Sequence, residues 1–128
     1  MVKDHPYIAV QGDFFSPTKA EQETGLKFSN KAEVGDIGNH GRFKGRPYPF
    51  GHAVLEAPEV MTLGKLDWLL DSVTPHKATL KQLGVTDGKV HVTYAYDSQC
   101  NLEYPPEIVE KLAKLGFAFT ITCYQDES

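Results

Sequence analysis

The chain has 128 residues, of which 41% are hydrophobic and 23% are charged, and its formal net charge is −4 at pH 7. These values predict a single globular domain over residues 1–128, large enough to bury a core without disulfides or metal ions. No apolar run approaches the ~20 residues of a membrane-spanning helix, so no membrane segment is expected. The first residues lack the apolar stretch of a secretory signal, and we therefore expect a cytoplasmic protein.

The negative charge is concentrated near the carboxyl end. Up to Tyr94 the chain has eleven Lys or Arg and eleven Asp or Glu, whereas residues 95–128 hold two Lys and six Asp or Glu. Such a segment repels phosphate groups, which makes nucleic acid an unlikely partner for this part of the chain. A partner protein with a basic surface, such as a basic toxin, is the better electrostatic complement.

The first part of the chain predicts a strand, a short helix and a long loop. Residues 7–15 alternate between apolar and polar side chains, which is typical of a strand with one buried face. The apolar face comprises Ile8, Val10 and Phe14. Ser16 and Pro17 are typical helix-start residues, and the helix is expected to end near Gly25. Residues 26–51 contain five glycines and are expected to form a long glycine-rich loop.

The middle of the chain predicts a short strand over residues 52–56 and then two helices. Thr62 is expected to cap the first helix. Its apolar stripe comprises Leu63, Leu66, Leu69, Leu70 and Val73. Thr74 and Pro75 begin the second helix, which Gly84 ends.

The last third predicts a strand, a helix and a final strand. Residues 90–96 alternate, with Val90 and Val92 on the apolar face. The prolines at 105–106 begin a helix that Gly116 ends, and residues 117–123 alternate again. Two cysteines are too few for a disulfide framework. We expect Cys123 to be a buried thiol on the last strand and Cys100 to be exposed in a polar turn.

The complete order of elements is strand–helix–strand, two helices, and strand–helix–strand. This order predicts an α+β fold similar to a ferredoxin-like sandwich (βαβ-αα-βαβ), with helices on one face of a mainly antiparallel sheet.

Several of these motifs are found together in one known family. They are Ser16-Pro17 after the first strand, the Leu-Asp-Trp-Leu-Leu sequence at 66–70, Pro105, Leu115-Gly116, and a final strand ending in Tyr124. With them the chain resembles an uncharacterised family of short bacterial proteins, a domain of unknown function. The resemblance implies a shared architecture over most of the chain. Because its motifs are leucines, prolines and glycines that shape the fold, it implies no catalytic residue.

The glycine-rich loop contains the first candidate binding site. Glycines let backbone amides approach a ligand closely, arginine and lysine bind phosphate or carboxylate, and aromatic rings stack on a base or ring. The candidate binding residues are His40, Arg42, Lys44, Arg46, Tyr48 and His52. The alternative is structural: the aromatic side chains pack under the sheet while the charges keep the loop in solvent.

The acidic segment contains the second candidate site. A tyrosine between acidic residues is a typical anchor for a protein partner. The candidate residues are Asp97, Glu103, Tyr104, Glu107 and Glu110. The alternative for the two helical glutamates is local pairing with Lys111 and Lys114, four residues further on, across a solvated helix face.

No catalytic residue, metal site or cofactor is predicted. No pair of histidines, and no cysteine–histidine pair, has the sequence spacing typical of metal ligands, and no nucleophile lies beside a histidine in the sequence. Three functions stay open, and no oligomeric state is predicted. The first is a non-catalytic protein-binding module, most concretely an immunity-type protein that neutralises a toxin through its acidic surface. The second is a small-ligand or nucleic-acid-binding domain that uses the basic loop. The third, the least favoured, is a hydrolase whose site assembles from distant residues.

Overall fold

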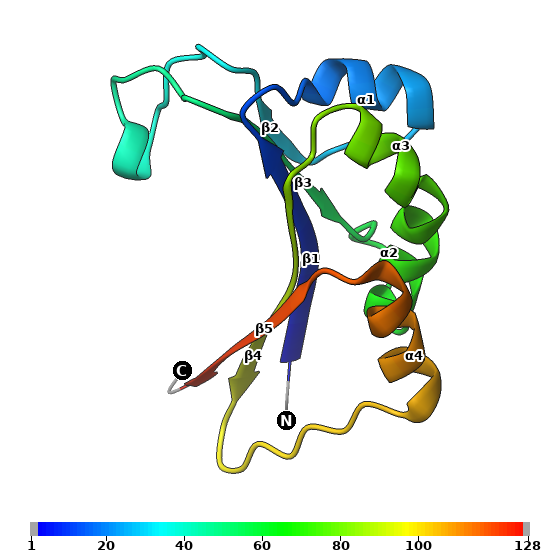
Figure 1. Ribbon diagram of the computed structural model, residues 1–128. Coiled ribbons are helices and arrows are strands. Elements are labelled where there is room, and N and C mark those ends of the chain that lie inside the picture. Colours follow the sequence, from blue (N-terminus) through cyan, green and yellow to red (C-terminus); the bar gives the residue numbers. More distant parts are fainter. Residues whose placement is uncertain (1–2, 127–128) are drawn as a thin grey trace.

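Five strands form one mixed sheet, and the helices pack against one of its faces (Figure 1). The computed structural model describes residues 3–126. The strands are β1 (Lys3–Gly12), β2 (Asn30–Ala32), β3 (Gly51–Glu56), β4 (Asp87–Tyr96) and β5 (Ala118–Gln125). The helices are α1 (Pro17–Thr24), α2 (Lys65–Val73), α3 (Lys77–Gln82) and α4 (Pro106–Leu115), with short 3-10 turns η1 (Gly41–Phe43) and η2 (Thr74–His76). The predicted α+β class is confirmed, and within residues 3–126 no helix has the length and apolar character needed to cross a membrane.

The strand order is β2-β3-β1-β4-β5, and every neighbouring pair is antiparallel except β4 and β5. The ferredoxin-like topology is not confirmed. In that split arrangement, another strand lies between the two strands that flank each helix. Here β4 and β5 are direct parallel neighbours joined through α4, whereas β1 and β3 are direct antiparallel neighbours. Only the second half of the chain therefore forms a parallel strand–helix–strand unit.

The core lies between the sheet and the helices. Alternate residues of the central strands face it, including Ile8 and Val10 on β1 and Val90 on β4. From the helical side the core receives Leu69, Leu70, Val73, Leu80 and Leu115. Ile108 and Phe119 pack against this cluster from α4 and β5. None of α1, α2, α3 and α4 lies on the opposite face of the sheet (Figure 1), and we call it the open face.

The first strand begins earlier than predicted and ends at Gly12. A turn follows, in which the Phe15 amide donates to the Gly12 carbonyl over 3.2 Å. The turn interrupts the alternation, so Phe15 enters the core at 1% exposure while Phe14 is 92% exposed. The prediction that Phe14 lies on the buried face is therefore wrong. A side chain at Gly12 would meet the Gly84 carbonyl at 1.9 Å, so the strand end is pressed against a neighbouring backbone.

The first central helix begins later than predicted. Gly64 adopts a left-handed conformation (φ 72°), and α2 starts at the next residue. Thr62 therefore does not cap the helix, and Leu63, expected on its apolar stripe, is 85% exposed. The other leucines of the stripe behave as predicted, because the buried part of the pattern begins within the first turn.

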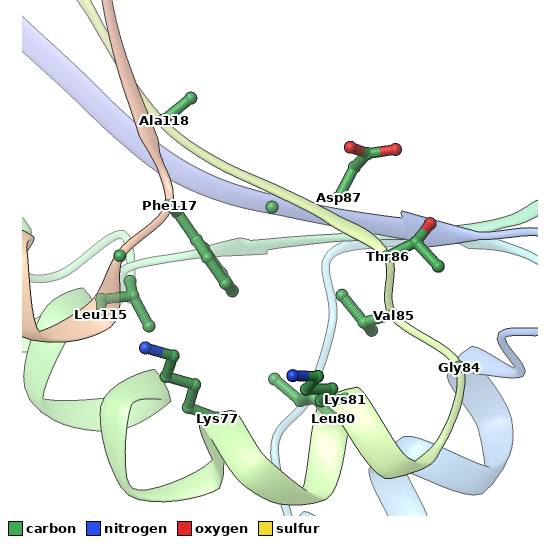
Figure 2. A pocket seen from close by; sticks show the side chains of 12 residues that line it. Lys77, Leu80, Lys81, Gly84, Val85, Thr86, Asp87, Leu115, Phe117 and Ala118 are labelled. Atoms are coloured by element: carbon green, nitrogen blue, oxygen red, sulfur yellow. The ribbon is translucent and has the colours of Figure 1, made fainter.

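Residues 87–88 and 115–118 form a close junction between the starts of β4 and β5 (Figure 2). The Phe117 ring lies across Gly88, and a Cβ atom at Gly88 would lie 2.6 Å from that ring. Glycine is therefore required at this position of β4 unless the ring moves.

The last strand is an edge strand whose far end points away from the helices (Figure 1). Cys123 is exposed and Cys100 is half-buried, so both cysteine predictions are wrong. Alternation placed Cys123 on the same side as Phe119, but helix cover on that side ends before the strand does. Burial and the neighbouring Cys123 thiol raise the pKa of Cys100 above its ordinary value.

Candidate functional site

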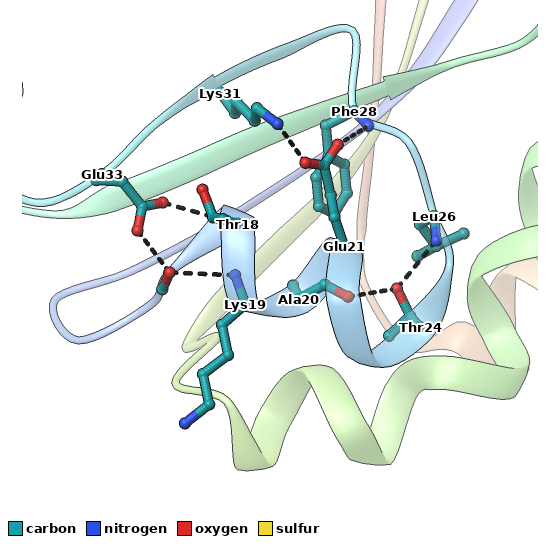
Figure 3. A network of polar contacts seen from close by, with 10 residues as sticks. Thr18, Lys19, Ala20, Glu21, Thr24, Leu26, Phe28, Lys31 and Glu33 are labelled. Carbon is teal, nitrogen blue, oxygen red and sulfur yellow. Dashed lines mark hydrogen bonds and ion pairs between the residues drawn. The ribbon is translucent and has the colours of Figure 1, made fainter.

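The first part of the predicted loop is fastened to α1 and to the sheet. The Glu21 carboxylate accepts a hydrogen bond from the Phe28 amide over 3.0 Å and forms an ion pair with Lys31 (Figure 3). The bond to Lys31, and then the Phe28 amide, lower the pKa of Glu21. Residues 30–32 form β2 against β3, an element that the glycine-rich composition did not reveal.

The N-terminus of α1 holds the next residues of this segment. Glu33 accepts hydrogen bonds from the Ser16 hydroxyl and, over 3.3 Å, from the Thr18 amide (Figure 3). The Asp36 carboxylate in turn accepts a hydrogen bond from the Glu33 amide over 2.9 Å. The first amides of a helix lack intrahelical partners and attract negative charge, so a carboxylate here is stabilising. The chain is therefore anchored up to residue 36.

Residues 36–50, which we call the loop excursion, project on the open-face side of the sheet (Figure 1). The excursion is supported by its own backbone. The Gly38 amide donates to the Arg46 carbonyl over 2.9 Å, and the Tyr48 amide donates to the Asp36 carbonyl over 2.8 Å. A side chain at Gly38 would meet the Phe43 carbonyl oxygen at 2.3 Å, which is why glycine is needed there.

An aromatic cluster joins the loop excursion to β3. It comprises Phe43, Tyr48, Phe50 and His52. The Tyr48 and His52 ring centroids lie 4.8 Å apart, and those of Phe43 and Phe50 lie 5.6 Å apart in an edge-to-face arrangement. All four side chains are half-buried. The packing that the structural alternative anticipated is therefore present, on the open face rather than in the core.

A recess of about 300 Å³ lies between the loop excursion and the open face. Four of the six predicted loop residues line it: His40, Arg42, Tyr48 and His52. The other two, Lys44 and Arg46, are exposed and do not line it. Arg46 supports the excursion, because its guanidinium donates to the Arg42 carbonyl.

The electrostatics of the recess differ between its rim and its interior. Arg42 is exposed at the rim, with its guanidinium carbon 5.7 Å from the Phe43 ring centroid, and it forms no ion pair within residues 3–126. Burial, and then the charge of His40, lower the pKa of His52. The interior therefore offers a neutral imidazole and aromatic walls, while the rim offers a cation.

The sheet side of this recess was not predicted from the sequence. Gln11 and Val54 line it from β1 and β3, and Phe50 lines it from the end of the excursion. The available signal was the alternation of β1, which places Gln11 opposite the core residue Val10. The pairing that sets Gln11 beside His52 depends on strand register, which the sequence did not show.

The acidic candidates come from two neighbouring segments of the chain. Asp97 and Glu103 lie in the connection between β4 and α4, and Glu107 and Glu110 lie on α4. Tyr104 is half-buried: its hydroxyl hydrogen-bonds that of Tyr94 over 2.7 Å, and its ring meets Phe119 edge-on at 5.2 Å. Burial, and then the Tyr94 bond, raise the pKa of Tyr104.

The predicted pairing of the helical glutamates with lysines is wrong. Lys111 instead forms ion pairs with Asp67 and, over 2.9 Å, with Asp71, both on α2. Those two bonds raise the pKa of Lys111. Within residues 3–126, Glu107 and Glu110 form no ion pair, and both are exposed.

Two other histidines, His5 and His91, make contacts of other kinds. His5 forms an ion pair with Glu56 over 2.6 Å, and the His91 ring lies 5.1 Å from that of Tyr7 on the open face. Among the residues that the structure describes, no three His, Cys, Asp or Glu side chains are grouped so that they can hold a metal ion.

No family model matches this chain, and neither curated proteins nor solved structures show a significant match to it. The resemblance to a family of short bacterial proteins therefore stays a prediction, and any functional argument depends on the chain's own geometry.

Proposed function

We propose that this protein binds a small anionic ligand carrying an aromatic ring in the recess between the loop excursion and the open face. One observation supports this proposal above the others: His40, Arg42, Tyr48 and His52 line the same recess. A recess with aromatic walls and a few convergent polar groups is the usual form of a small-molecule site, and about 300 Å³ is at the small end of the usual range.

Each group in the recess has a chemical role in this proposal. The Arg42 guanidinium at the rim binds the carboxylate or phosphate of the ligand, since its planar fork matches those anions. Tyr48 and Phe50 contact the ring of the ligand. His52, which burial keeps neutral, exchanges a hydrogen bond with a polar ring atom, as does the Gln11 amide.

Titration of the ¹⁵N-labelled protein with adenosine 5′-monophosphate, a probe with a ring and a phosphate, tests the proposal. We expect shifts at the amides of Gln11 and Val54 and an affinity that falls with salt. Adenosine and inorganic phosphate, each lacking one half of the probe, should bind at least tenfold more weakly. A single-stranded oligonucleotide that binds while the mononucleotide does not would contradict the proposal and favour nucleic-acid binding.

Two matched variants locate the site. Arg42→Gln should lower the affinity for the mononucleotide about tenfold, a typical value for losing one charge-assisted contact. Lys44→Gln removes the same charge from the same turn, but Lys44 does not line the recess, so its effect should stay under about twofold. Equal losses in the two variants would show attraction to the net charge of the turn and would contradict a defined site.

A second proposal is an immunity-type role, in which the acidic surface binds a basic toxin. The observation that favours it is the pairing of Lys111 with α2, which leaves the exposed Glu107 and Glu110 without an ion pair within residues 3–126. Val109 between them is 52% exposed. An apolar centre with a charged rim is typical of a protein-binding surface.

Co-expression with a basic toxin encoded beside this chain's gene tests the second proposal. The wild type should protect the cell and co-elute with the toxin. Replacing Glu103, Glu107 and Glu110 by lysine should abolish both effects, because like charges then face each other. Replacing Glu23 and Glu59, exposed acids elsewhere, is the matched control. Protection that survives the first replacement, or no protection by the wild type, would remove the proposal.

A further inference from the structure

A cavity of about 770 Å³ lies on the helical side of the sheet, away from both candidate sites (Figure 2). It is open to solvent on one side and is bordered by α3, by the beginning of β4, and by the junction of α4 with β5. Its apolar lining comprises Leu80, Val85, Leu115 and Phe117. A volume of this size accommodates a small organic molecule rather than a few waters.

The apolar lining is part of the folded core and is therefore preformed. Leu80 and Leu115 are almost fully buried and support the lining from beneath. Val85 and Phe117 pack against the same core cluster but are only half-buried, so they supply the apolar surface that a ligand can reach. The Phe117 ring is held over Gly88, where there is no space for a side chain. A ligand that enters this cavity meets an existing apolar surface and does not have to create one.

Two lysines of α3 supply the charge of the cavity. Lys77 and Lys81 are four residues apart, on the same face of the helix, and their side chains border the cavity (Figure 2). The Lys77 ammonium donates to the Lys114 carbonyl over 3.2 Å, which fixes it near the end of α4. Lys81 forms no ion pair within residues 3–126. Asp87 is the one acidic residue of the lining, and its carboxylate points away from both ammonium groups (Figure 2).

We propose that this cavity binds an amphipathic carboxylate, an aliphatic acid whose chain lies on the half-buried Val85 and Phe117 and whose carboxylate pairs with Lys77 and Lys81. The charge of the lining selects an anion, and the apolar surface selects a ligand with an extended hydrocarbon part. This site shares no lining residue with the recess, so the two can be tested separately.

Titration calorimetry with hexanoate, octanoate and decanoate below their micellar concentrations tests the proposal. Each added methylene that becomes buried should raise the affinity about fourfold. Octanol, which lacks the charge, and acetate, which lacks the chain, should bind at least tenfold more weakly than octanoate. Equal binding of octanol and octanoate, or an affinity independent of chain length, would overturn the proposal.

Variants and amide shifts place the ligand in the cavity. Lys81→Gln should lower the affinity for octanoate about fivefold to tenfold. Lys89→Gln is the matched control, because Lys89 is an exposed lysine on β4 that does not line the cavity. Octanoate should shift the amides of Val85 and Phe117 and leave those of Gln11 and Val54 unchanged. Equal effects of the two variants, or shifts confined to the recess residues, would overturn the proposal without affecting the test of the recess.

Discussion

Two of the connections that leave the sheet keep their shape by different means. The loop excursion, residues 36–50, is basic and is held by backbone hydrogen bonds around Gly38. The acidic connection, residues 97–105, contains no backbone–backbone hydrogen bond between its own residues in the described chain. It is held chiefly by the Tyr104 side chain, whose hydroxyl bonds that of Tyr94 and whose ring packs against Phe119. A loop of the first kind tolerates changes at its exposed side chains, such as Lys44, but not the loss of its glycine. A loop of the second kind depends on single side chains.

The largest effect is expected at Tyr104, where the acidic connection is most vulnerable. Tyr104→Ala removes the ring against Phe119 and leaves the Tyr94 hydroxyl without its partner, which should cost about 2–3 kcal/mol of unfolding free energy. Tyr104→Phe keeps the ring and should cost about 1 kcal/mol. Urea unfolding measures both values. Equal losses would mean that the ring contact contributes nothing.

Gly38→Ala tests the backbone support of the loop excursion. The new methyl group would meet the Phe43 carbonyl oxygen at 2.3 Å. The backbone hydrogen bonds that hold the excursion should therefore be destabilised by about 1–2 kcal/mol. Hydrogen exchange at the Gly45 and Arg46 amides should accelerate, while amides of β4 keep their protection. Lys44→Ala, an exposed change in the same turn, should alter neither. Unchanged exchange at Gly45 in the glycine variant would contradict the contrast between the two connections.

A smaller, pH-dependent effect is expected at His52. Burial lowers its folded-state pKa below the ordinary 6.5, so the unfolded chain takes up a proton first as the pH falls. The His52 contribution to stability is fully present above about pH 6.5 and declines as the pH falls toward the folded-state pKa. Urea unfolding at pH 7.5 and pH 5.5 should show a smaller decrease in His52→Gln than in the wild type. An equal decrease in both proteins would contradict this assignment.

The smallest effect concerns the reactivity of the acidic connection rather than its stability. Burial and the Cys123 thiol raise the pKa of Cys100, so less thiolate is present at pH 8 and alkylation by iodoacetamide should be slower than for a model thiol. Cys123→Ser removes the neighbouring thiol and should accelerate the reaction of Cys100. If Cys100 in the wild type reacted faster than the model thiol, the direction of the shift would be wrong.

The errors in the sequence analysis occur where a glycine or a strand end interrupts a regular pattern. Phe14 and Leu63 both follow the apolar periodicity, but Gly12 and Gly64 place them outside their elements. Cys123 was misplaced because alternation predicts which side of a strand a residue faces, not whether anything covers that side. The loop residues were identified by composition. Their convergence on Gln11 and Val54 depended on how the excursion folds over the sheet.

The amino-acid sequence by itself determined the elements: the alternation of β1 and β4, the proline that begins α4 and the glycines that end α1 and α4 are local preferences of the chain. Tertiary structure alone decided the strand order, the ion pairs of Lys111 with Asp67 and Asp71, the recess and the cavity beside α3. The physical reason is the range of the interactions. Backbone propensities act over a few residues, whereas register, burial and ion pairing join residues tens of positions apart and are settled together by packing.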